Sequence, residues 1–216
     1  MSNTFSIEVF ATGCKQAMAQ ASDKKEAARA CLADAVESYG TSEIIRALQA
    51  AVPAGASIGE LIVHTSPELT MLYARIPGRF QSGIHNHTVC AAIAQLQGEE
   101  TNRIFEAGSD GSLRETRKTT VAVGDVLTLD KDVIHCIENP GDEQAHALHL
   151  YGGDFGAIAD QRSLWSWEKH EEKPFSFPEL LKESATAMHQ SGNRAGLDAL
   201  SEAMPATAPL VASLTK

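Results

Sequence analysis

The chain has 216 residues, of which 28 are acidic and 18 basic, and its formal net charge is -10. A length of this order suits one domain, or one domain with helical extensions. The hydrophobic share of 43% and the charged share of 21% are ordinary for a globular protein and exclude disordered, collagen-like and coiled-coil classes. Because the acidic balance repels phosphate backbones, we expect a small-molecule partner and no nucleic acid.

The N-terminus has no basic segment followed by a long apolar core, and the sequence contains no apolar run of about 18 residues. We therefore expect no membrane association and a cytoplasmic location. The four cysteines include no CxxC pair, which argues against a zinc ribbon or a redox dithiol. They are Cys14, Cys31, Cys90 and Cys136.

Two helices are expected near the N-terminus. The first runs from Ser22 to Tyr39, is rich in alanine and stops at Gly40. The second begins at Thr41 or Ser42 and ends before Pro53. Apolar positions at helical spacing define the expected buried faces. These are Ala27, Cys31, Ala35 and Val36 in the first helix and Ile44, Ile45, Leu48 and Ala51 in the second.

From about Glu60 the apolar pattern changes to short β-prone runs separated by turn signals. No helical pattern interrupts about ninety residues, which favours an antiparallel barrel or sandwich. The runs cover 60–64, 69–76, 84–97, 101–106, 116–123, 126–130, 133–138 and 145–151.

After Phe155 the pattern becomes helical again. Ser176 and Pro178 begin a helix that extends to about residue 190, and the tail from Pro205 is expected to fray. The expected organisation is an N-terminal helical region over 1–57, a β barrel over 58–158 and a C-terminal helical extension over 159–216 that packs on the barrel.

Three of the eight histidines have metal-ligand spacing. His85 and His87 are two residues apart on an expected strand, so their imidazoles should share one face. His135 follows Gly124 by eleven residues and precedes Asn139 by four. Together with Gly98 after the first pair, this pattern resembles the two motifs of the cupin superfamily.

The resemblance implies a mainly β fold, the cupin double-stranded β-helix or jelly-roll barrel, over roughly residues 60–155. It also implies one metal bound by His85, His87 and His135. The glutamate that usually completes this set falls on Ala91, so three neutral imidazoles and open coordination positions are expected. Imidazole ligands accommodate iron, zinc, copper and nickel, so the ligand set alone does not choose the metal.

His149 and Tyr151 alternate along the last run and should point into the barrel together. A buried imidazole and phenol need partners, which are expected to be each other or a ligand. The sequence LHLY with a following Phe155, downstream of the histidine motifs, is similar to cysteine dioxygenase and its bacterial relatives. That family has a Ser-x-His-x-Tyr triad beside its iron. His149 and Tyr151 match the last two positions as candidate catalytic residues, and Ala147 replaces the serine.

Cysteine dioxygenases also carry an arginine that grips the substrate carboxylate, about twenty-five residues before the first motif. No Arg or Lys lies between Arg46 and Arg75 here. Arg75, Arg79 and Arg103 are the candidate replacements, and without such an anchor L-cysteine is expected to be a poor substrate.

The leading interpretation is an iron(II)-dependent enzyme that oxidises a small thiol with O2 to a sulfinate, acting as a monomer or a homodimer. One alternative is another three-histidine cupin enzyme, such as a carbon-carbon cleaving dioxygenase, a lyase or an isomerase. The other is a non-catalytic cupin that binds a metal and a small molecule.

Overall fold

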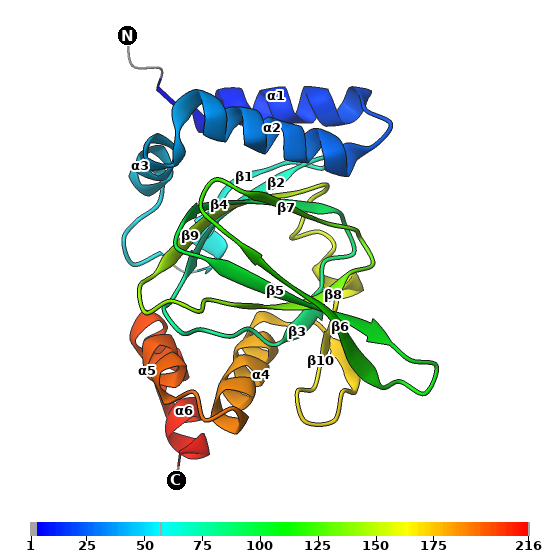
Figure 1. Ribbon diagram of the computed structural model, residues 1–216, viewed down its shortest axis with the longest axis vertical. Helices are drawn as coiled ribbons and strands as arrows, with labels where there is room; N and C mark the ends of the chain where they lie inside the picture. Colours follow the sequence, from blue (N-terminus) through cyan, green and yellow to red (C-terminus); the bar gives the residue numbers. More distant parts are fainter. Residues whose placement is uncertain (1–3, 57, 216) are drawn as a thin grey trace.

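The computed structural model describes residues 4–56 and 58–215. Three helices come first, a β barrel follows, and short strands and three further helices end the chain (Figure 1). Among the described residues, no helix is long and apolar enough to cross a membrane. The helices are α1 (Ile7–Gln20), α2 (Lys24–Tyr39), α3 (Thr41–Ala51), α4 (Phe177–Gln190), α5 (Arg194–Ala203) and α6 (Ala208–Leu214).

The strands form two antiparallel sheets of five and six strands, in the orders β1-β2-β9-β4-β7 and β11-β10-β3-β8-β5-β6. The central orders β2-β9-β4-β7 and β3-β8-β5-β6 are those of an eight-stranded jelly roll, which confirms the expected cupin double-stranded β-helix with helices at both ends. The strands are β1 (Ile62–Thr65), β2 (Thr70–Ile76), β3 (Ile84–Asn86), β4 (Ala91–Gln97), β5 (Glu100–Ala107), β6 (Leu113–Val121), β7 (Val126–Leu129), β8 (Ile134–Glu138), β9 (Ala145–Tyr151), β10 (Ser163–Trp165) and β11 (Glu172–Pro174).

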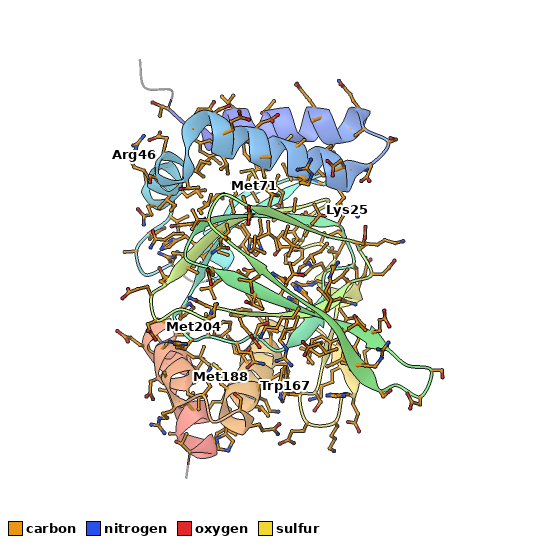
Figure 2. The ribbon with its side chains drawn as sticks, in the orientation of Figure 1. Lys25, Arg46, Met71, Trp167, Met188 and Met204 are labelled. Carbon is orange, nitrogen blue, oxygen red and sulfur yellow. The ribbon has the colours of Figure 1, made fainter. Side chains whose placement is uncertain are left out.

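The N-terminal helices cover the outer face of the five-stranded sheet (Figure 1). Met71, Leu148 and Leu150 on this face pack with Leu32 of α2 and Leu48 of α3, and Figure 2 shows Met71 beneath α2. The opposite face of the same sheet points into the barrel. All seven residues of β9 are buried because both faces of this strand are covered.

The N-terminal helices differ from the expectation in two ways. Helix α1 was not predicted, although Ser6 caps it by accepting a hydrogen bond from Val9. The buried face of α2 is rotated by about one residue from the predicted face. Small side chains line both the side of α2 toward the sheet and the side toward α1, so the apolar pattern did not distinguish them. The fully buried residues of α2 are Ala28, Leu32 and Ala35, whereas Ala27, Cys31 and Val36 are partly buried.

The run over 84–97, expected as one strand, is two strands in different sheets. It breaks at 87–90, where Thr88 has a φ of 59°. His87 therefore lies just beyond the end of β3 rather than within a strand. The expectation that strand alternation alone brings His85 and His87 together is therefore incomplete, because the turn after Asn86 also positions His87.

The C-terminal segment is less helical and more ordered than expected. Strands β10 and β11 extend the six-stranded sheet beyond residue 158, because Leu164 pairs with His85 and Trp165 pairs with Ile84. The tail from Pro205 forms a 3-10 turn (Pro205–Thr207) and then α6, whose Val211 packs with Met188 of α4 in a small helical core, so the expected fraying is wrong.

Three motif residues form the turns around the barrel. Gly98 and Gly124 have φ values of 69° and 91°, in the left-handed region that favours glycine. Asn139 is 3% exposed, and its Nδ2 donates to the carbonyl oxygens of Ile76 and Pro77. These residues fix backbone geometry and do not face the histidines.

We predict that Leu148→Ala lowers the free energy of unfolding by about 2 to 5 kcal/mol, because this side chain is 0% exposed between the sheet and the helices. Urea denaturation measures the loss. The control is Val9→Ala at a position that is 71% exposed, where a change within about 0.5 kcal/mol is expected. Equal losses in the two variants would contradict the packing of the helices on this sheet.

Candidate metal site

The structure brings His85, His87 and His135 together inside the barrel. Their candidate ligand atoms all lie within 4.8 Å of one another, and all three residues are buried. His85 pairs with His135 across β3 and β8. Strand pairing therefore joins residues that are fifty positions apart in the sequence.

Hydrogen bonds orient two of these imidazoles. His85 Nδ1 lies 3.0 Å from the Gly83 carbonyl oxygen, and His135 Nδ1 lies 2.9 Å from Asn102 Oδ1. Both oxygens are acceptors, so each Nδ1 carries the proton and each Nε2 keeps a lone pair.

Burial lowers the pKa of each of the three imidazoles, to about 4 for His85. They are therefore neutral near pH 7, which is the form that binds a metal. His87 Nε2 and His135 Nε2 face each other at 3.2 Å. Metal–nitrogen bonds of about 2.1 Å place two ligand nitrogens roughly 3.0 to 3.4 Å apart, for right-angled to tetrahedral geometry. The cluster thus fits a divalent transition metal.

His149 and Tyr151 lie beside this cluster on the inward face of β9. His149 Nδ1 is 3.0 Å from the Tyr151 hydroxyl, and the Tyr151 ring meets His87 edge to face with centroids 5.0 Å apart. Burial lowers the pKa of His149 to about 4 and raises the pKa of Tyr151. Both side chains are therefore neutral hydrogen-bonding groups near pH 7.

The sequence analysis missed a buried arginine next to the cluster. Arg162 follows a short 3-10 turn (Ala159–Gln161) and is 6% exposed. Its guanidinium lies 4.0 Å from the Phe155 ring centroid and 3.7 Å from that of Phe175. Nε donates to the Asn86 carbonyl oxygen, and the structure gives the Nη atoms no hydrogen-bond partner within the described residues.

Arg162 also influences the site electrostatically. Its charge contributes to lowering the pKa values of His85, His87 and His135. Burial lowers its own pKa to about 10, so the group stays cationic near pH 7. A buried cation with free donors beside three neutral imidazoles is suited to an anionic ligand.

The three arginines considered from the sequence all have other partners. Arg75 donates to the carbonyl oxygens of the loop after α3, and Arg79 pairs with Asp142. Arg103 pairs with Glu115 and Glu138 on the outer side of the six-stranded sheet. None of the three candidates therefore faces the histidine cluster, because Arg75 and Arg103 project from the outer faces of their strands and Arg79 lies in a loop.

The other histidines lie apart from this cluster. His146 is buried against Tyr73, and its Nδ1 contacts the Tyr73 hydroxyl at 2.5 Å. His189 is exposed on α4. His64 and His170 are half-buried and belong to no described group of metal-ligating residues.

No family model matches the sequence, and no curated protein matches it either. Partial likenesses to solved structures exist. The DMSP lyase DddQ from Ruegeria pomeroyi DSS-3 is 20% identical over 41% of this chain and 40% of that chain, with a TM-score of 0.33. This chain thus spans well under half the length of that lyase.

Two further solved structures are similar over a comparable share. A cupin superfamily protein from Desulfitobacterium hafniense DCB-2 is 17% identical over 43% of this chain and 74% of that chain, with a TM-score of 0.35. Hydroquinone 1,2-dioxygenase from Sphingomonas sp. TTNP3 with 4-hydroxybenzoate bound is 12% identical over 42% and 62%, with a TM-score of 0.35. Similarities at this level do not indicate an activity for this chain. The fold is assigned from the order of its strands.

We predict that His135→Ala abolishes stoichiometric metal binding, because two remaining imidazoles cannot hold a transition metal through dilution. Metal analysis after anaerobic loading and desalting gives the stoichiometry. His189→Ala, on an exposed position of α4, is the control and should bind as much metal as the wild type. Undiminished metal content in the His135→Ala protein would contradict the assignment of His135 as a metal ligand.

Proposed function

We propose that the protein is an iron(II)-dependent dioxygenase that oxidises a small anionic thiol to a sulfinate. One observation carries the proposal: three neutral imidazoles meet beside a buried phenol and a buried guanidinium with free donors. The resemblance to the three-histidine thiol dioxygenases agrees with the first two features. The reaction converts RSH and O2 into RSO2H, so both oxygen atoms end on sulfur.

His85, His87 and His135 would hold the iron. Bound iron would lower the pKa of the thiol and bring thiolate and dioxygen together. Three neutral ligands leave the ion its full charge, which favours an anionic substrate.

Arg162 would hold the acidic group of the substrate. Its Nη donors are free for a bidentate contact with a carboxylate, and the Phe155 and Phe175 rings keep the guanidinium plane in place. The sequence expectation that L-cysteine is a poor substrate depended on the lack of such an anchor. Arg162 removes that argument, so thiols with a carboxylate become the favoured class.

Tyr151 would donate a hydrogen bond to substrate or oxygen, with its hydroxyl held by His149. Phe155 stacks on Tyr151 with centroids 4.0 Å apart and links the phenol to the Arg162 side of the site. The buried phenol has a raised pKa and so acts as a proton donor and not as a phenolate.

The direct test is anaerobic loading with iron(II), followed by oxygen consumption with a thiol panel and sulfinate detection by mass spectrometry. We expect L-cysteine or 3-mercaptopropionate to be oxidised with higher kcat/KM than cysteamine, which lacks a carboxylate. Absence of thiol-dependent oxygen uptake in iron-loaded protein would refute the proposal and favour another three-histidine chemistry.

Arg162→Met should lower kcat/KM for a carboxylated thiol by about one to two orders of magnitude, the loss expected for a charge-assisted contact of about 1.5 to 3 kcal/mol. The value for cysteamine should change much less. Arg103→Met is the matched control, because Arg103 also lies over aromatic rings but outside the barrel. A uniform loss on all thiols would mean that Arg162 serves packing alone.

Tyr151→Phe should reduce kcat strongly while leaving metal stoichiometry near that of the wild type. The reason is that the phenol contributes an oriented donor and is not a metal ligand. Turnover and metal content are measured on the same preparation. Equal kcat in the two proteins would show that Tyr151 only fills the interior.

A further inference from the structure

Glu100 is a fully buried carboxyl group that the proposed reaction does not use. It lies at the start of β5, is 0% exposed, and its Oε1 accepts a 2.7 Å hydrogen bond from Asn102 Nδ2. Its Oε2 has no hydrogen-bond partner among the described residues. Burial raises the pKa of this carboxyl to about 7. A buried acid with no cation at hydrogen-bond distance favours its protonated form.

His149 Nε2 is a second buried atom that has no hydrogen-bond partner in the part of the chain that the structure describes, and it lies 3.8 Å from Glu100 Oε2. This distance is too long for a hydrogen bond. Two unpaired polar atoms that face each other in a dry interior are costly, and a small side-chain shift with one shared proton would satisfy both. The lowered pKa of His149 and the raised pKa of Glu100 favour a neutral pair over an ion pair.

These contacts form one chain across the barrel. It starts at His135, whose Nδ1–H donates to Asn102, and continues through Glu100 to His149 and Tyr151. The gap between Glu100 and His149 is the one link in it that is longer than a hydrogen bond. The chain connects a candidate metal ligand with the candidate phenol donor.

We propose that Glu100 is the residue that positions His149, donating a hydrogen bond from Oε2 to Nε2 and so holding the imidazole as its Nδ1–H tautomer. The resembling family uses a serine for this task, and Ala147 stands at that position here. Nδ1–H then donates to the Tyr151 oxygen, so the phenol keeps its own proton for a further donor bond. With the opposite tautomer, the Tyr151 hydroxyl would donate its hydrogen bond to His149 Nδ1 and could not donate to another group.

A catalytic role for the Tyr151 proton rests on the proposed function. The tautomer of His149 can be tested whether or not that function is correct. Nitrogen-15 NMR of histidine-labelled protein measures the tautomer directly, in metal-free and zinc-loaded protein. We expect His149 to show a protonated Nδ1 and an unprotonated Nε2, with the signals assigned by their absence in His149→Gln. A protonated Nε2 in the wild type would overturn the assignment of Glu100 as the donor.

Substitutions at Glu100 separate positioning from packing. Glu100→Gln keeps an acceptor for Asn102 and places an amide donor where Oε2 lies, so it should preserve the tautomer and keep kcat within about threefold of the wild type. Glu100→Leu removes both functions. It should give mixed tautomers and about 10- to 100-fold lower kcat, with less change in KM and unchanged metal stoichiometry.

Glu183→Gln is the matched control. Glu183 is also buried, at 4% exposure, but its partners are Trp167 and Lys173 outside the barrel. It should alter neither the His149 tautomer nor kcat. A wild-type tautomer and kcat in Glu100→Leu would overturn the positioning role. If the wild type oxidises no thiol, the proposed function fails, and the tautomer measurements still decide the role of Glu100.

Discussion

Polar side chains that point into the barrel are shielded from water, so each must bond to the protein or to a ligand. This constraint keeps the imidazoles of His85, His87 and His135 neutral, because burial lowers their pKa values. The Gly83 carbonyl oxygen and Asn102 Oδ1 accept hydrogen bonds from the Nδ1–H groups of His85 and His135, which leaves a lone pair on Nε2 of each of these two imidazoles. His135 Nε2 lies 3.2 Å from His87 Nε2, a separation that suits two nitrogen ligands of one metal.

The covering of the barrel on its outer side makes this interior possible. Helices α1 to α3 bury the outer face of the sheet that carries β9, while strand β10 extends the sheet that carries β3. His149 and Tyr151 are therefore held on a strand that is packed from both sides. A rigid strand of this kind can keep a donor within the small tolerance that catalysis requires.

Much of the fold and part of the site follow from local sequence signals. Turn residues and short apolar runs predict the strands, and motif spacing predicts that His85, His87 and His135 converge. Arg162 and Glu100 could not be predicted in this way, since their surroundings depend on long-range pairing. Arg162 reaches the site because β10 pairs with β3, and Glu100 meets His149 across the barrel interior.

The pairing of β10 with β3 also makes the C-terminal segment part of the site. Leu164 pairs with His85, and Arg162 Nε bonds the carbonyl oxygen of Asn86, which lies between the first two candidate ligands. A shift of this segment would therefore move the guanidinium and disturb the backbone that carries His85 and His87. If the chain binds a metal and an anionic substrate as proposed, these few bonds would connect the two events, and each would stabilise the geometry that the other requires.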